Sequence, residues 1–175
     1  MVFAVVVLLV AVAVGYGAGG GLDRLGRLSL RHARLVVAAV VLQLAGGLVG
    51  GPAYPVGLAG SALLVAAFLA GNRGVRGTGL VALGLLSNAL VVGLNGAMPV
   101  STEASGRAGI TTQDILSGSD PRHALAGPQT RLRLLGDVIP VLLPAHPEVV
   151  SAGDVLVAAG LAQLVLVGMT RRLPD

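Results

Sequence analysis

The sequence has too few charged side chains to cover the surface of a soluble protein of its length. Of its 175 residues, 12 are basic and 8 are acidic, so that 11% of the chain is charged and 54% is hydrophobic. A soluble domain carries about 25% charged residues. The composition therefore excludes a soluble globular fold and predicts a chain whose main partner is the lipid bilayer.

Other residue types are absent or nearly so. The chain has no Cys, which excludes disulfides, thiolate metal sites and cysteine nucleophiles. It has no Trp, two Phe and two Tyr, so it lacks the aromatic side chains on which nucleic-acid bases stack, and we expect no nucleic-acid partner. All 12 basic residues are Arg, and with the excess of Ala, Gly and Val this indicates GC-rich, bacterial coding DNA.

Long uncharged runs are abundant, and each has at least about the 20 residues that a helix needs to cross a bilayer. One run is too long for a single span, and Gly50-Gly51-Pro52 with Pro55 divides it at a hairpin. The sequence predicts an all-α membrane protein, a single domain over 1–175 with a bundle of about five transmembrane helices. A loop-rich external cap is expected at 101–150, and the spans are expected at 2–22, 35–50, 55–71, 79–98 and 152–170.

The positions of the arginines predict how the chain is oriented, because short loops rich in Arg stay in the cytoplasm. With the N-terminus outside, eight of the 12 arginines are cytoplasmic, and the cap, with four arginines and five acidic residues, is external. We expect a multi-pass plasma-membrane protein with a cytoplasmic C-terminus. Its first run lacks the basic start of a signal peptide and is expected to be retained. The eight arginines are Arg24, Arg27, Arg31, Arg34, Arg73, Arg76, Arg171 and Arg172.

Polar side chains inside the spans have two interpretations. Amides such as Gln43, Asn88 and Gln163 either join helices by hydrogen bonds or line a path for a solute. None of them ionises, which favours the first interpretation over transport, and we expect Asn88 and Gln163 each to bond to another helix. Close helix packing is further predicted at three pairs of small residues, Gly15/Gly19, Gly46/Gly50 and Gly47/Gly51.

The cap contains turn signals and an apolar segment punctuated by prolines. Asn95-Gly96 and Pro99 are expected to end the fourth span. Asp120-Pro121 is typical of a turn that opens a short helix, here through Ala124. The segment 131–144 is too short to cross a bilayer, so we expect it to dip into the outer interface.

Asp137 and Asp154 are the candidate site residues. Asp154 follows Ser151 by three residues, a spacing typical of a helix cap in which Ser151 and Asp154 exchange hydrogen bonds. Asp137 lies among apolar residues and needs a partner, for which Arg131 or Arg133 is nearest in sequence. The chain between the two aspartates is rich in proline and therefore stiff. We expect it to bring both aspartates to the same external side of the membrane, within about 10 Å of each other, where they could share a proton.

The second half of the chain resembles a known family in several short blocks. They run from Asn95-Gly96-Ala97-Met98-Pro99-Val100-Ser101, through His123-Ala-Leu and Thr130-Arg-Leu, to Leu135-Gly136-Asp137-Val138-Ile139-Pro140 and Ser151-Ala152-Gly153-Asp154. These blocks are similar to a family of small bacterial integral-membrane proteins described only as a domain of unknown function. Ala97 and Ala152 depart from its pattern, which has Gly and Ile there. The resemblance implies a polytopic membrane fold and no particular activity.

A weaker resemblance concerns the two aspartates alone. Gly136-Asp137-Val-Ile and Gly153-Asp154-Val-Leu are similar in order and spacing to the catalytic aspartates of lipoprotein signal peptidase, a small polytopic aspartyl peptidase. The resemblance implies that Asp137 and Asp154 would be catalytic. The sequence departs from that enzyme because no Asn precedes Asp154 in its usual context and because there is an extra span.

Several functions therefore stay open. A structural or partner-binding subunit that docks on another membrane protein fits the sequence best, with an aspartyl peptidase and a small-solute transporter as alternatives. No cofactor is expected. No metal site is expected either, because the side chains that could supply ligands lack motif spacing. They are His123, His146, Asp120, Asp137 and Asp154.

Overall fold

The computed structural model describes residues 2–27, 30–117, 120–144 and 146–171, and most of these residues lie in five long helices. Three of the helices are long and apolar enough to cross a membrane, whereas the other two have 16 residues each. Sixteen residues span about 24 Å, which is less than the hydrocarbon thickness of about 30 Å. The three long ones are α4 (Ala53–Gly71), α5 (Thr78–Asn95) and α8 (Ala152–Thr170), and the shorter ones are α1 (Val2–Gly17) and α3 (Arg34–Val49).

The first apolar run is divided, although the sequence predicted one span over 2–22. Helix α1 ends at Gly17, the chain turns through Gly19 with a φ of 74°, and a short helix, α2 (Leu22–Gly26), follows. Successive glycines disfavour a continuous helix here, because glycine loses more conformational entropy than any other residue when it becomes helical. The other expected ends are close to the observed ones. The hairpin at Gly50-Gly51 is confirmed, and so is the end of α5 before Gly96.

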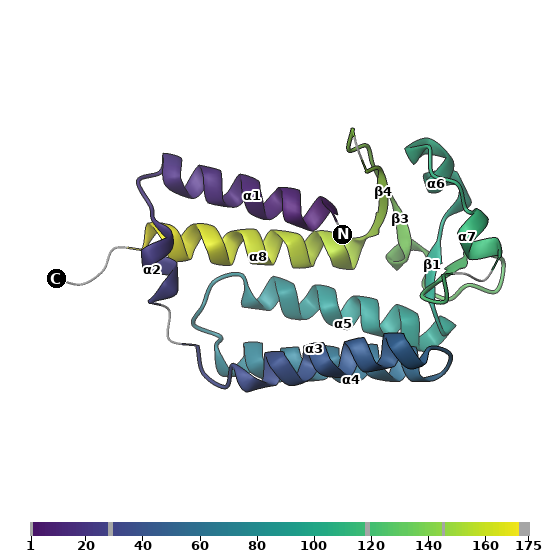
Figure 1. Ribbon diagram of the computed structural model, residues 1–175, viewed down its shortest axis with the longest axis horizontal. Coiled ribbons are helices and arrows are strands. Elements are labelled where there is room, and N and C mark those ends of the chain that lie inside the picture. The colour runs from purple at the N-terminus through teal and green to yellow at the C-terminus, as the bar shows by residue number, and fades with distance from the viewer. Residues whose placement is uncertain (1, 28–29, 118–119, 145, 172–175) are drawn as a thin grey trace.

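The five long helices pack in a row (Figure 1). Helix α1 packs on α8, α8 on α5, α5 on α4, and α4 on α3, so that α1 and α3 lie at the ends of the row and each packs mainly on one neighbour. The helices therefore form an open row and not the bundle that the sequence suggested. Its two end helices keep most of their apolar side chains exposed.

Glycine lets α5 and α8 approach most closely. A Cβ atom at Gly160 would lie 2.7 Å from the carbonyl oxygen of Gly77, and one at Gly153 would collide with the Asn88 side chain. The predicted glycine pairs are partly right. Gly46 does face α4 and Gly15 does face Met169 of α8, but their expected partners Gly19, Gly50 and Gly51 lie in turns at positive φ.

A four-stranded sheet lies beyond the start of α8, where the sequence predicted a loop-rich cap without strands (Figure 1). Its order is β2-β1-β3-β4, with β1 parallel to both β2 and β3, and β3 antiparallel to β4. The prediction of an all-α fold was therefore wrong for this part of the chain. The strands are β1 (Met98–Val100), β2 (His123–Leu125), β3 (Asp137–Val141) and β4 (Glu148–Ser151).

One further expectation about the cap is corrected by this sheet. Of the residues expected to form a short helix through Ala124, His123 and Ala124 lie in β2 instead. Residues 137–141 of the segment 131–144 form β3, and the expected dip of that segment into the interface stays a prediction. The strands have three to five residues, and β1 and β3 each contain a proline, so neither shows the alternation by which strands are recognised. The remaining elements are the short helices α6 (Thr102–Ala108) and α7 (Gln113–Leu116) and the 3-10 turn η1 (Arg133–Leu135).

Candidate functional site

Ser151 joins the sheet to helix α8. It is the last residue of β4, it is 0% exposed, and it is also the N-cap of α8. Its hydroxyl accepts a hydrogen bond from the Asp154 amide at 3.0 Å, and Oδ2 of Asp154 accepts one from the Ser151 amide, also at 3.0 Å. The predicted reciprocal cap is therefore confirmed, and it fixes the Asp154 carboxyl group at the edge of the sheet.

Asn88 of α5 completes this arrangement from the neighbouring helix. Its Nδ2 donates to Oδ1 of Asp154 at 2.8 Å, and its Oδ1 accepts from the Ser151 hydroxyl at 2.9 Å. The predicted bond from Asn88 to another helix is confirmed. Both oxygens of Asp154 now act as acceptors, as those of a carboxylate do. Gly153 makes room for the amide, since a Cβ atom there would occupy its place.

Asp137 lies directly opposite this cap. It begins β3, where it is the register partner of Ser151 on one side and of Val100 on the other. Its backbone oxygen also accepts from the Ser101 amide at 2.9 Å. The sheet thus places Asp137 beside the Asn88–Ser151–Asp154 cluster. The two aspartates lie on the same side of the helix row, as expected, and their catalytic role stays a prediction.

Burial changes the proton affinity of Asp137. The residue is 5% exposed, and this desolvation, together with the negative charge of Asp154, raises the pKa of Asp137 from 3.8 to about 8. At neutral pH Asp137 therefore carries its proton, and the two carboxyl groups hold a single negative charge between them. One group can act as an acid and the other as a base, which is the division of roles that water activation uses.

The expected salt bridge from Asp137 to Arg131 or Arg133 is wrong. Both arginines are exposed around η1, and among the described residues neither side chain forms an ion pair. The neighbour of Asp137 is His123 of β2, whose Nε2 lies 3.6 Å from Oδ2 of Asp137. Proximity in sequence predicted the wrong partner, because the arginines around η1 are exposed to solvent. The parallel sheet instead brings His123, which is 14 residues from Asp137 in the sequence, next to the Asp137 carboxyl group.

His123 extends the site toward the surface. Its Nδ1 lies 2.7 Å from Oδ2 of Asp120, and Asp120 also accepts from the amide and the side chain of Arg122. Partial burial raises the pKa of Asp120, but the bonds from His123 and Arg122 outweigh it and hold that pKa below its ordinary value. A chain of polar groups thus runs from an ionised surface carboxylate through an imidazole to the protonated Asp137.

The remaining predicted residues lie elsewhere. Gln163 of α8 is exposed and, of the described residues, bonds to none on another helix, so the expectation for it was wrong. His146 is exposed in the chain between β3 and β4.

Within the described ranges, no three His, Asp or Glu side chains are arranged to hold a metal ion. Two surface pockets of about 330 and 300 Å³ lie on the sheet end, and neither is lined by Asp137 or Asp154.

Sequence reasoning missed the role of His123 but noted most of the other residues. The only local signal was its position three residues after Asp120. The contact with Asp137 depends on the parallel pairing of β1 with both β2 and β3, which no local pattern announces.

Comparison with known proteins gives a family and no activity. No curated protein and no solved structure matches the chain. A family model does match, over residues 27–166, and this range includes every residue of the Asp137–Asp154 site. The chain therefore belongs to the family of unknown function DUF5317, the kind of family that its second-half blocks resemble.

Proposed function

We propose that the chain is a partner-binding subunit of the bacterial plasma membrane, with five spans, its N-terminus outside and its C-terminus in the cytoplasm. The arginines support this topology. All those in the described segments around α2, the start of α3, the α4–α5 loop and the end of α8 lie at the end of the row opposite the sheet (Figure 1). Arg172 lies outside the described residues. The 16-residue helices α1 and α3 can cross if the bilayer thins locally or flanking side chains extend to its surface.

Two exposed amides carry the proposal of partner binding. Gln43 lies within α3 and Gln163 within α8, each surrounded by apolar residues, and both side chains are exposed in the single chain. An unpaired amide in hydrocarbon costs several kcal/mol, whereas a hydrogen bond between helices recovers part of that cost. A second transmembrane helix on each face removes the penalty, and such a helix is the partner that we propose.

The surroundings of both amides suit a closely packed helix. One turn beyond Gln43 is Gly47, and no heavy atom lies within 4 Å of the place where its Cβ would be. Gln163 continues an exposed stripe of α8 that includes Val155 and Ala159, at spacings of four residues. Small residues beside a polar one are the pattern by which transmembrane helices associate.

Transport receives less support from the same arrangement. A solute path requires polar side chains that connect the two faces of the membrane. Of the described amides, Gln43 and Gln163 face outward from the row, and Asn88 is bonded within the Asp137–Asp154 site.

The partner surfaces can be tested by cysteine crosslinking, because the chain has no Cys of its own. Gly47→Cys and Ala159→Cys place a thiol one turn from each amide. In native membranes we expect each variant to give a crosslinked product, and we expect Gln43→Leu or Gln163→Leu to abolish the product at the same face. The mass of the product tells whether the partner is a second copy or another protein.

Leu48→Cys is the matched control, because Leu48 is 88% exposed on the same helix as Gly47 but points in another direction. Crosslinking from Leu48→Cys as strong as from Gly47→Cys would mean random collision. Products that survive the Gln→Leu substitutions would contradict the role of the amides, and no product at either face would contradict the proposal.

An aspartyl peptidase is the second candidate, and the raised pKa of Asp137 beside Asp154 favours it. Asp137 would donate its proton to the peptide while Asp154 accepts one from the attacking water. Access weighs against this function, since Asp137 is 5% exposed and both oxygens of Asp154 are engaged. The site would have to open for a substrate.

Substitution to asparagine separates the two functions. If the chain is a peptidase, purified wild type hydrolyses peptides presented in micelles, whereas Asp137→Asn and Asp154→Asn each remain folded, by thermal unfolding, and lose turnover. Turnover that persists in either variant would dispose of the catalytic interpretation. We expect no turnover by wild type and unchanged crosslinking by Asp137→Asn.

A further inference from the structure

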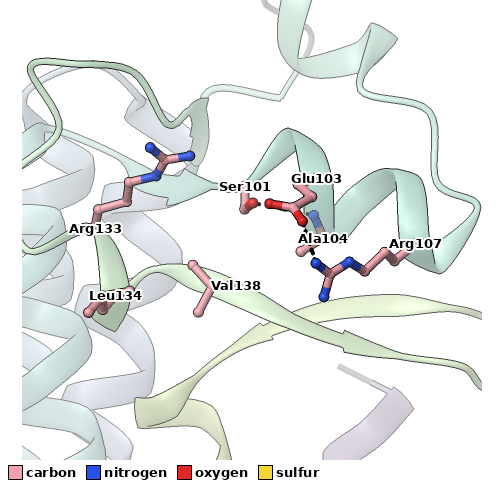
Figure 2. Close-up of a pocket in the computed structure, with 7 residues that line it drawn as sticks. All are labelled: Ser101, Glu103, Ala104, Arg107, Arg133, Leu134 and Val138. Carbon is pink, nitrogen blue, oxygen red and sulfur yellow. Dashed lines mark hydrogen bonds and ion pairs between the residues drawn. The ribbon is translucent and has the colours of Figure 1, made fainter.

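A pocket on the sheet end combines basic and apolar side chains (Figure 2). It has a volume of about 330 Å³ and lies between α6, η1 and the start of β3. Figure 2 shows Arg133 on one side of it, Glu103 and Arg107 of α6 on the other, and Val138 and Leu134 below. A pocket lined in this way suits a ligand that has both an anionic and an apolar part.

Arg133 is the unpaired charge in this pocket. Arg107 forms an ion pair with Glu103, and Arg122, outside the pocket, forms one with Asp120. Within the described ranges, the guanidinium of Arg133 has neither an ion pair nor a hydrogen bond. The pocket lining therefore carries a net charge of +1, contributed by two arginines and one glutamate. Glu103 opposes an anion, but its carboxylate is already neutralised by Arg107.

The position of η1 indicates where such a ligand would come from. This turn packs on α5 and α8 and also contacts β3, so the pocket adjoins the ends of two long apolar helices. Leu134 of η1 is 82% exposed, although it is large and apolar. An exposed leucine that directly follows Arg133, next to the ends of two apolar helices, is the arrangement of a segment that lies at the level of lipid headgroups.

We propose that this pocket binds the headgroup phosphate of an anionic phospholipid. Arg133 contacts the phosphate as a fork of parallel N–H donors, and Leu134 and Val138 contact the glycerol and first acyl carbons. The proposal rests on the membrane placement proposed above but not on partner binding. It assigns the exposed η1 turn to lipid recognition rather than to the Asp137–Asp154 site.

Lipid retention by the purified full-length chain tests the proposal. Wild type, Arg133→Gln and Arg131→Gln are reconstituted with equal amounts of phosphatidylglycerol and phosphatidylcholine, purified again in detergent, and weighed by native mass spectrometry. Arg131 is the matched control because it is exposed two residues away and does not line the pocket. We expect Arg133→Gln to lower bound phosphatidylglycerol about five-fold, because it removes the phosphate contact in the pocket. We expect Arg131→Gln to change it less than two-fold, because Arg131 does not line the pocket.

Four outcomes overturn the proposal or separate it from its premise. Equal losses in the two variants would mean general attraction between arginine and an anionic surface, and no loss in either would exclude the pocket. Displacement of phosphatidylglycerol by millimolar inorganic phosphate would assign the pocket to free phosphate rather than to lipid. Extraction of the chain from membranes by alkaline carbonate would contradict the membrane placement itself, whatever the two variants do.

Discussion

An asparagine organises each end of the helix row, but the two ends differ in their chemistry. At the arginine end, Asn72 is buried and bonds only to backbone: to both peptide groups of Arg31 at 2.9 and 3.0 Å and to the oxygen of Phe68 at 2.7 Å. At the sheet end, Asn88 bonds to the side chains of Ser151 and Asp154, beside Asp137. The first arrangement holds no titratable group, whereas the second holds a pair of carboxyl groups. The sheet end therefore holds a buried carboxyl group of raised pKa, and the bonds of Asn72 involve no carboxyl group.

The largest expected effect removes the space that the sheet end needs. Gly153→Val places two methyl groups where the Asn88 amide and the Gly84 backbone lie, so α5 and α8 must separate. We expect the free energy of unfolding in detergent to fall by more than about 3 kcal/mol. Gly79→Val is the control, because the space beside Gly79 in α5 is open, and its effect should stay below about 1 kcal/mol. Equal effects at both positions would mean that close packing of α5 on α8 is unimportant.

The pH dependence of stability is the next largest effect. The pKa of Asp137 is raised to about 8 by burial and by Asp154, so the folded chain holds a proton that the unfolded chain, with an ordinary value of 3.8, releases. Stability is then greatest near pH 4 and decreases as the pH rises toward 8, by about 1.4 kcal/mol per pH unit. Asp137→Asn, which resembles the protonated form, should abolish this decrease. Denaturant unfolding at pH 5 and pH 7 measures it.

The controls for this prediction come from the other end of the row. Asn72→Ala should lower stability equally at both pH values, because its partners are peptide groups. If Asp137→Asn retains the full pH dependence of wild type, the titrating group lies elsewhere in the chain.

A smaller effect compares the two asparagines directly. Asn88→Ala leaves the Ser151 hydroxyl and Oδ1 of Asp154 without this partner, and we expect a loss of about 2 kcal/mol at neutral pH. Asn72→Ala should also lower stability, but it removes hydrogen bonds to peptide groups alone. Chemical unfolding in detergent measures both losses, and an Asn88→Ala variant as stable as wild type would mean that the bonds to Ser151 and Asp154 do not stabilise the fold.

The smallest effect concerns Glu148, which accepts bonds from the first two described amides of α1, those of Val2 at 2.7 Å and Phe3 at 2.9 Å. Partial burial raises the pKa of Glu148, but the bonds at the start of α1 outweigh it and lower that pKa. Its contribution is present above pH 4.5 and is lost as the pH falls, opposite in sign to that of Asp137. Glu148→Gln should cost about 0.5 kcal/mol at pH 7 and progressively less as the pH falls below 4.5, by thermal unfolding.

Local signals account for what the sequence predicted correctly, and long-range pairing accounts for what it did not. Proline and glycine mark the ends of α3, α4 and α5, and the spacing of Ser151 and Asp154 specifies their cap within four residues. The sheet is different, because its strands are short and are assembled from segments up to 53 positions apart, from Met98 to Ser151. The partner of Asp137 was misassigned for the same reason: Arg133 is near in sequence, whereas His123 is near only in the sheet.

The shared position of Ser151 has a mechanical consequence. Strand β4 ends at Ser151 and α8 begins at Ala152, so no flexible residue separates the sheet from the helix. A force that displaces the sheet must therefore tilt α8 as a rigid body, and the tilt would pivot at the close contact of Gly153 with Gly84, because Gly153 lies only two residues from Ser151. The far end of α8, near Met169, contacts Gly15 of α1 and the turn at Gly20. Motion that begins outside the row would in this way reach the arginine end through one helix.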